Sequence, residues 1–300
     1  MQRIFVTGGT GFVGRRVVRA LLAHGLLVRC LVRPGSEEDL RGFEAIERVP
    51  GDVLHPRGLA AGVEGCSAIV HLVGIIREHR LRGVTFDALH RRATEHMLAI
   101  AHEAGVRRFV HMSALGVRAD ARSGYHRTKW QAEEAVRASG LAWTIFRPSL
   151  IYGTGDGFVS MVANMIRRLP VLPILGDGRY RLQPVVVEHV AEGFARACMW
   201  EGSAGRTYEI AGPTPYPYLD LVDEIARAMD ESPPRKVHAP MPLVKAMTRG
   251  LGWLPFFPVT RDQLLMLEEE SVADAGPFYA DFNLAPEPLP DGLRRMLAPR

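Results

Sequence analysis

TGGTGFVG, residues Thr7 to Gly14, is the stretch that decides the fold of this 300-residue sequence. It follows an apolar, β-rich run from Arg3 to Thr7, and after it the apolar residues recur at helical spacing. The stretch therefore predicts a strand, a tight glycine turn and a helix, in that order.

The glycines of this turn have the spacing GxxGxxG. Gly8 permits the tight turn, Gly11 lets the backbone approach a pyrophosphate, and Gly14 lets the helix pack closely on the strand. The helix N-terminus then offers free N–H groups and a partial positive charge to phosphates. Because a strand precedes the motif and a helix follows it, we predict a dinucleotide site. The predicted cofactor contacts in this turn are Gly8, Thr10, Gly11, Phe12, Val13 and Gly14.

The alternation of strand and helix continues along the chain. We expect strands at Leu27 to Val32, Ala68 to Val73, Phe109 to Ser113 and Trp143 to Arg147, and helices at Thr94 to Ala104 and around Lys129 to Ser139. This order predicts the α/β class, with a doubly wound parallel sheet (a Rossmann fold). His71 and His111 interrupt two otherwise apolar strands, and we interpret them as residues at strand ends.

The texture of the sequence changes after Pro148, where glycines and prolines separate shorter elements. We therefore assign residues 1–150 to a nucleotide-binding Rossmann domain and residues 151–300 to a smaller C-terminal substrate or lid lobe. In the apolar segment from Pro240 to Val259, we expect Trp253 to Val259 to cover the active-site cleft. Contact with a membrane or a partner protein is the alternative.

Composition limits the function classes. The net charge of +4 is spread along the chain, which argues against nucleic acid as the main partner. No apolar run is long enough to span a membrane and no signal-peptide pattern is present, so we expect a cytoplasmic location. The three cysteines, without CxxC spacing, suggest neither a disulfide framework nor a metal site.

The end of the second strand bears on the choice of cofactor. NAD-specific sites usually carry an acidic residue there to bind the ribose hydroxyls, whereas this strand ends Leu31-Val32-Arg33. An arginine removes the repulsion against a 2′-phosphate and can bind it. We therefore predict NADP as the cofactor, with NAD as the alternative. The other interpretation of Arg33 is a solvated cation at a strand end.

Two further segments follow strands and point to the same edge of the sheet. In Gly51-Asp52-Val53, Asp52 could accept a hydrogen bond from the adenine amino group. In Leu72-Val73-Gly74, a small residue would let the cofactor lie close to the backbone. Ligands bind at the carboxyl ends of strands in such sheets. We therefore add Asp52, Val53, Leu72, Val73 and Gly74 to the predicted cofactor contacts.

Tyr125 and Lys129 lie four residues apart, so on a helix their side chains share one face. A nearby ammonium favours the phenolate and would lower the tyrosine pKa from about 10, making Tyr125 a candidate general acid or base. Ser113, at the end of the preceding strand, could donate a hydrogen bond to a substrate oxygen. Lys129 is also one of only three lysines in the chain.

With these motifs, the sequence resembles the extended or atypical branch of the short-chain dehydrogenase/reductase superfamily, which includes NAD-dependent epimerases and dehydratases. The resembling segments are TGGTGFVG at Thr7 to Gly14, GD at Gly51 and Asp52, HMSALG at His111 to Gly116, YxxxK at Tyr125 to Lys129 and FRPSLIYGTGD at Phe146 to Asp156. We also count Pro148, in the last segment, among the cofactor contacts.

The resemblance implies roles for the candidate residues. Tyr125 would move the proton, Lys129 would also bind the nicotinamide ribose, and Ser113 would polarise a carbonyl. The segment from Leu175 to Ala191 resembles the return strand and helix of the extended branch. Residues around 182–200 are therefore expected to return to the Rossmann sheet.

Within that branch, the sequence most resembles proteins related to the NADPH-binding accessory subunit of respiratory complex I. It departs from the extended pattern in two ways. Ser113 and Tyr125 are only twelve residues apart, a shorter separation than is usual. The fourth helix often opens NVxGT, but here the segment reads HRRAT, so His90 replaces the asparagine of the usual proton relay.

Two functions from different classes follow. The first is an NADP-dependent oxidoreductase, or an epimerase or dehydratase with the same cofactor, that acts on a small-molecule substrate with Tyr125 as acid or base. The alternative is a non-enzymatic NADPH-binding accessory or assembly protein of a respiratory or quinone-linked complex, peripherally associated with a membrane complex. A monomer and a homodimer are both compatible with the sequence, which does not identify the substrate.

Overall fold

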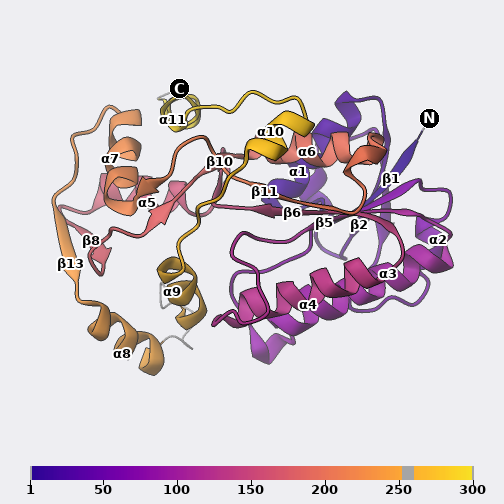
Figure 1. Ribbon diagram of the computed structural model, residues 1–300, viewed down its shortest axis with the longest axis horizontal. Helices are drawn as coiled ribbons and strands as arrows, with labels where there is room; N and C mark the ends of the chain where they lie inside the picture. Colours follow the sequence, from indigo (N-terminus) through magenta and orange to yellow (C-terminus); the bar gives the residue numbers. More distant parts are fainter. Residues whose placement is uncertain (1, 252–259, 299–300) are drawn as a thin grey trace.

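The computed structural model describes residues 2–251 and 260–298, and its centre is one large parallel sheet (Figure 1). The strand order is β11-β6-β5-β4-β1-β2-β3, and every neighbouring pair is parallel. The bounds are β1 (Arg3–Thr7), β2 (Leu27–Val32), β3 (Ile46–Pro50), β4 (Ala68–His71), β5 (Arg108–Met112), β6 (Ala142–Pro148) and β11 (Arg206–Ile210). The predicted α/β class with a doubly wound parallel sheet is confirmed.

Helices cover both faces of this sheet (Figure 1). One face carries α1 (Phe12–Ala23), α6 (Val187–Met199) and α10 (Gly276–Asp281). The other face carries α2 (Leu59–Val63), α3 (Ala93–Glu103) and α4 (Gly124–Ala138). Successive side chains of a strand point to opposite faces, so each strand contributes to both layers.

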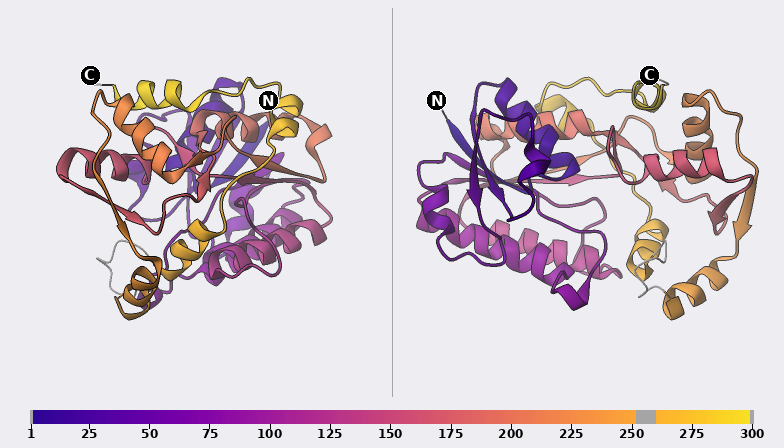
Figure 2. Two further views of the ribbon diagram at one scale, coloured as in Figure 1. Left: turned by 60° about the vertical axis from the view of Figure 1, so that its left-hand side comes forward. Right: turned by 180° about the vertical axis from the view of Figure 1, so that it is seen from behind.

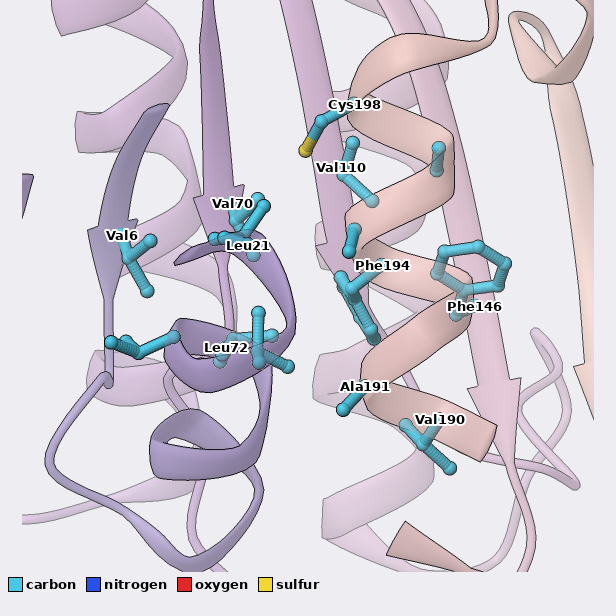
Figure 3. Packing of buried hydrophobic residues seen from close by; sticks show 14 of the residues in the cluster. Val6, Leu21, Val70, Leu72, Val110, Phe146, Val190, Ala191, Phe194 and Cys198 are labelled. Carbon is cyan, nitrogen blue, oxygen red and sulfur yellow. The ribbon is translucent and has the colours of Figure 1, made fainter. Parts of the chain in front are cut away.

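The layer under α1 and α6 shows how the alternation works. Val110 and Phe146 from the strands pack against Val190, Ala191 and Phe194 of α6, and Figure 3 shows these side chains between helix and sheet. The neighbouring strand residues, such as Phe109 of β5, belong to the separate cluster under α3 and α4. A strand covered on both faces must be apolar on both, which explains the nearly continuous apolar runs in the sequence.

The remaining elements build a smaller layer beyond the end of β6 (Figure 1), and the right-hand view of Figure 2 shows the same layer from behind. They are β7 (Ile151–Tyr152), α5 (Val159–Arg168), β8 (Leu172–Leu175), β9 (Arg181–Leu182), β10 (Val185–Val186), β12 (Tyr216–Pro217), α7 (Tyr218–Ala228), β13 (Lys236–Ala239), α8 (Met241–Leu251), α9 (Arg261–Glu268) and α11 (Leu289–Leu297). Side chains of α5, α7 and α11 form its apolar core. Two elements that lie between these in the sequence belong to the larger part: β11 pairs with β6 in the large sheet, and α6 packs on one face of that sheet.

Four short turns complete the described elements: η1 (Glu37–Leu40), η2 (Arg80–Arg82), η3 (Asp87–Arg92) and η4 (Glu201–Ser203), of which η3 is a π-helical turn. None of the helices in the described part of the chain is both long and apolar enough to cross a membrane. The predicted cleft-covering residues Trp253 to Val259 lie outside the described residues, because the structure describes nothing between 252 and 259.

Two element ends differ from the sequence-based expectation by more than one residue. Helix α4 begins at Gly124, well before Lys129, because the hydroxyl of Ser123 accepts a hydrogen bond from the backbone N–H of His126 at 3.1 Å. A serine in this position satisfies a backbone donor that the first turn leaves free. Strand β4 ends at His71 and not at Val73, so the residues up to Gly74 are free to approach a ligand.

Arg108 joins the sheet to α6 although its side chain is almost fully buried. Its guanidinium donates to the carbonyl oxygen of Ala197 at 2.8 Å, to that of Ala142 at 2.7 Å and to the hydroxyl of Ser203 at 2.7 Å. Ala197 lies in the last turn of α6, where carbonyl groups have no partner within the helix. The arginine therefore satisfies the helix end and neighbouring strand groups at once.

Replacing this arginine tests its structural role. Arg108→Met removes the donors and leaves buried acceptors unsatisfied, so we expect a loss of about 3 kcal/mol in the free energy of unfolding, measured by urea denaturation. The matched control is Arg107→Met, because Arg107 is exposed and should change stability by less than about 0.5 kcal/mol. Equal stability of the two variants would show that the buried bonds contribute nothing.

Candidate functional site

The topology places several chain segments at one edge of the sheet. From β1 the chain continues to β2 on one side, whereas β4 pairs with β1 on the other side. Ligands bind outside the carboxyl ends of strands at such a switch point. The glycine turn follows β1, Leu72 to Gly74 follow β4, and Ser113 follows β5.

The glycine turn is built by close backbone contacts. Gly8 has a φ of +76°, and its carbonyl oxygen accepts a hydrogen bond from Gly11 N at 3.1 Å. A Cβ at position 14 would overlap that carbonyl oxygen and lie 2.7 Å from the Cα of Gly9. Only glycine fits there, so α1 can start directly against the turn.

The N-terminus of α1 has the properties of an anion site. Its N-cap residue, Gly11, makes no side-chain capping bond, and the first turn contains no acidic residue. The free N–H groups and the helix dipole therefore face the switch point without a competing carboxylate. These residues fit the pyrophosphate of a dinucleotide.

The predicted determinants of the adenosine end lie around this turn. Arg33, directly after β2, is exposed and makes no ion pair within the described part of the chain. Asp52 accepts a hydrogen bond from Leu54 N at 2.9 Å, so its carboxylate already stabilises the turn after β3. The predicted contact of Asp52 with adenine stays a prediction.

Lys129 is a buried residue of α4. Its ammonium donates to the carbonyl oxygen of Met112 at 2.7 Å, and a Cβ at Gly74 would lie 3.1 Å from its Nζ. Burial lowers the pKa of Lys129 to about 8, while the carboxylate of Glu133 partly offsets this effect. The structure therefore brings Lys129 and Gly74 together next to Ser113.

Ser113 is buried at the end of β5. Its backbone N–H continues the ladder to β6 by donating to Phe146 O at 2.7 Å. Its hydroxyl oxygen has no hydrogen-bond partner within residues 2–251 and 260–298. Buried hydroxyl groups are usually bonded, so this one is available to a substrate oxygen.

Tyr125 lies in an apolar and aromatic environment. Its ring meets those of Phe86 and His90 edge-on, with centroid distances of 5.8 and 5.2 Å. We expected Lys129 to lower the pKa of this tyrosine, and that expectation is wrong in this structure. Burial raises the pKa of Tyr125 to about 12, so the phenol is protonated at neutral pH.

His90 joins the segment after β4 to helix α4 through hydrogen bonds that the sequence did not reveal. Its Nε2 accepts a hydrogen bond from Ile75 N at 3.2 Å, and its Nδ1 lies 2.9 Å from the hydroxyl of Thr128. The residue sits in the π-helical turn η3, a type of distortion that is frequent at functional sites. The histidine stood out in sequence, but Ile75 and Thr128 are 15 and 38 residues away.

Helix α9, from the C-terminal part of the chain, binds the start of α4. The carboxylate of Asp262 accepts a hydrogen bond from Gly124 N at 2.6 Å. Just beyond α9, Glu269 lies 3.1 Å from Nδ1 of His126 and pairs with Arg118 at 3.0 Å. These contacts lie on both sides of Tyr125 in the sequence, so α9 is fixed beside the candidate catalytic residue.

Comparison with known protein families shows which family the chain belongs to. Residues 8–162 match a family model described as NAD(P)H-binding, a span that includes the glycine turn, Ser113, Tyr125 and Lys129. The chain belongs to this NAD(P)H-binding family. The match supports a nicotinamide dinucleotide as its cofactor.

Curated relatives of this NAD(P)H-binding chain include a subunit of mitochondrial NADH dehydrogenase and two reductases. Mitochondrial NADH dehydrogenase (ubiquinone) 1 alpha subcomplex subunit 9 of Arabidopsis thaliana is 30% identical over 303 residues, covering 95% of this chain and 74% of the relative. Ceramide reductase of Caulobacter vibrioides is 33% identical, covering 65% of this chain and 60% of the relative. A farnesyl-dihydroquinoline-oxide ketoreductase of Stigmatella aurantiaca is 33% identical, covering 71% and 69%.

Solved structures agree over nearly the full length. The crystal structure of gox2253 superposes with a TM-score of 0.79 at 26% identity, covering 99% of this chain and 97% of that one. UDP-glucose 4-epimerase of Thermotoga maritima superposes with a TM-score of 0.76 at 18% identity, covering 99% and 97%. The second likeness shows the fold alone.

Two buried histidines, His71 and His111, lie at or next to the ends of β4 and β5. Nδ1 of His71 is 2.7 Å from the hydroxyl of Thr7, whereas neither ring nitrogen of His111 has a partner among the described residues. The two rings stack at 5.6 Å. Burial, with a smaller effect of the Lys129 charge, lowers the pKa of His71 to about 3 and that of His111 well below its usual value.

These neutral histidines predict a dependence of stability on pH. Burial likewise lowers the pKa of His90 to about 2. Below about pH 6.5 the unfolded chain binds protons at these groups that the folded chain does not, so stability falls as pH falls. One such histidine contributes a slope that averages about 1 kcal/mol per pH unit between about pH 7 and pH 5 and approaches about 1.4 kcal/mol per pH unit at lower pH. His111→Phe should reduce the slope of unfolding free energy against pH by about 1 kcal/mol per pH unit, measured by urea unfolding between about pH 7 and pH 5.

His55 supplies the matched control, because it is exposed. His55→Phe should leave the slope unchanged. If both variants had the same pH dependence as the original chain, His111 would be protonated as readily in the folded state as in the unfolded state.

Proposed function

We propose that this chain is an NADP(H)-dependent oxidoreductase that reduces a carbonyl group of a small-molecule substrate. The observation that carries the proposal is the buried pair of Tyr125 and Lys129 on one face of α4, beside the ends of β4 and β5. When bound, the reduced nicotinamide supplies the hydride. The residues of the chain bind the cofactor and substrate and control the proton.

The residues around the switch point would hold the dinucleotide. The glycine turn and the N-terminus of α1 would bind the pyrophosphate. The free guanidinium of Arg33 would bind the 2′-phosphate, which favours NADP over NAD. Lys129 would bind the nicotinamide ribose, next to the bare backbone of Gly74.

The proton chemistry follows from burial. Tyr125, with a pKa of about 12, is an acid at neutral pH and would donate its proton to the carbonyl oxygen as negative charge develops there. Ser113 would donate a hydrogen bond to the same oxygen. Lys129, with a pKa of about 8, is mostly charged at pH 7 and would supply a positive charge near the oxygen on which negative charge develops.

A protonated tyrosine favours reduction over the epimerase and dehydratase alternatives, since those reactions begin by removing a proton from the substrate. Two of the relatives are also named as reductases, those of Caulobacter vibrioides and Stigmatella aurantiaca.

A second function rests on the similarity to subunit 9 of mitochondrial NADH dehydrogenase, which covers 95% of this chain. In that case the chain would bind NADPH without consuming it and would serve as an accessory protein of a respiratory complex. The two functions differ in turnover and not in cofactor binding.

The cofactor preference is tested at Arg33. Arg33→Asp removes a charge-assisted hydrogen bond and adds a repelling carboxylate, so NADPH affinity should fall at least about tenfold while NADH affinity is retained. Dissociation constants from the fluorescence of the bound nucleotides give the ratio. The exposed Arg107→Asp is the matched control and should change neither constant. Equal or tighter binding of NADH than NADPH by the original chain would contradict the assignment.

The acid role is tested with Tyr125→Phe, which keeps the ring and removes the proton. With phenanthrenequinone as the carbonyl probe, NADPH oxidation should fall at least about 100-fold while NADPH affinity changes little. Tyr208→Phe is the control. Tyr208 lies on β11, the edge strand of the sheet, and its hydroxyl donates a hydrogen bond to Asp281 at 2.8 Å. A Tyr125→Phe variant as active as the control would remove the tyrosine from the mechanism. NADPH binding by the original chain without oxidation would favour the accessory function.

A further inference from the structure

We propose that one face of this protein docks onto an anionic membrane surface. This docking face consists of the turn formed by residues 76–84, helix α8, and the exposed Arg122 and Arg261 at the junction of α4 and α9. The proposal goes beyond the proposed function, because docking does not require the reaction.

Exposed apolar side chains are concentrated on this face. The four most exposed large apolar side chains in the described part of the chain are Leu81 (105%), Ile76 (59%), Val237 (58%) and Leu243 (55%). Three of the four belong to the docking face, and Met247 (43%) adds to them. Single exposed apolar residues are normal on a soluble protein, but a gathering of them marks an interaction site.

Leu81 stands at the tip of a closed turn. His79 N donates to Val84 O at 2.8 Å, which closes the turn around η2. At its base, the carboxylate of Glu78 accepts a hydrogen bond from Phe86 N at 2.9 Å, and Phe86 packs on the ring of Tyr125. The backbone bonds therefore hold Leu81 outward, so its exposure belongs to a braced turn.

Helix α8 presents a second apolar edge. Val244 is buried, while Leu243 and Met247, four residues apart on one side of the helix, are exposed. Lys245 of α8 pairs with Glu268 of α9 at 2.6 Å, which anchors α8 to α9. Figure 1 and the right-hand view of Figure 2 show α8 and the purple segment leading into α3 along the same lower edge of the molecule.

Positive charge accompanies these apolar side chains. Residues 76–84 contain three arginines and one glutamate, and α8 contains no acidic residue. Arg82, Arg122 and Arg261 are exposed and form no ion pair with another described residue. Arg122 and Arg261 are close in sequence to Gly124 and Asp262, which are joined by a hydrogen bond. Gly124 also lies next to Phe86, which follows the turn of residues 76–84 by two positions.

The combination favours a bilayer as the occupant. Anionic lipid headgroups attract basic residues, and the region below them accepts apolar side chains. Leu81 lies directly between Arg80, which pairs with Glu78 at 2.8 Å, and Arg82, which has no such partner among the described residues, so an apolar tip and a cation are presented together. Docking would bring the start of α4, with Tyr125, next to the membrane.

The test is co-sedimentation of the full chain with phosphatidylcholine vesicles, with and without about one third phosphatidylglycerol. We expect binding to the anionic vesicles and little binding to the neutral ones. Leu81→Ser should weaken binding about fivefold, and Arg82→Glu, which reverses a charge, roughly tenfold or more. NADPH affinity, unchanged in both variants, reports that they fold.

Matched controls come from other parts of the molecule. Met199→Ser changes another exposed apolar side chain (40%), which lies on α6 and outside the docking face, and Arg107→Glu reverses an exposed charge directly before β5. Both should bind vesicles like the original chain. Absence of vesicle binding, equal binding to neutral vesicles, or equal losses in the controls would overturn the proposal.

Two other outcomes separate the alternatives. Self-association that Leu81→Ser abolishes, without vesicle binding, would overturn the proposal in favour of a second copy of this chain as the occupant of the docking face. Vesicle binding without NADPH oxidation would leave docking intact and reject only the proposed reaction.

Discussion

A side chain at position 14 would overlap the carbonyl oxygen of Gly8, and the rest of the structure depends on the close approach that glycine permits there. That approach lets α1 begin directly against the turn after β1, with its free N–H groups at the carboxyl edge of the sheet. Because β1 is also the strand at which the strand order reverses, the segments that follow β4 and β5 arrive at the same edge. One backbone contact thus fixes the place at which the chemistry can occur.

The second constraint is electrostatic. The ammonium of Lys129 is buried beside three imidazoles, those of His71, His90 and His111, and each has a lowered pKa caused first by burial and then by the charge of Lys129. The imidazoles are therefore neutral, and Lys129 carries the positive charge among these four groups. A fixed single cation next to Ser113 and Gly74 suits a site in which negative charge develops on one oxygen.

The sequence was sufficient for the fold and for part of the site. Periodicity is local, so the strands at Arg3–Thr7 and Leu27–Val32 could be predicted to the residue. The approach of Gly74 and Ser113 to one edge followed from the rule that ligands meet strand ends, whereas the place of Lys129, on helix α4, followed from the YxxxK spacing and the family resemblance. The partners of His90 and Arg108 could not be predicted, because those bonds join residues 15 to 95 positions apart. Nor could the pKa of Tyr125, because the spacing to Lys129 reports proximity and not burial.

That last difference arises from the way the C-terminal part of the chain meets α4. Asp262 and Glu269 bind Gly124 and His126, 138 and 143 residues away in sequence, and Met266 of α9 joins the apolar cluster around Tyr125. The aromatic and aliphatic surroundings exclude water from the phenol, and this desolvation raises its pKa. A YxxxK motif on an isolated helix would have a solvated tyrosine with a pKa of about 10. The further rise of the Tyr125 pKa to about 12 is therefore a property of the assembled protein and not of the motif.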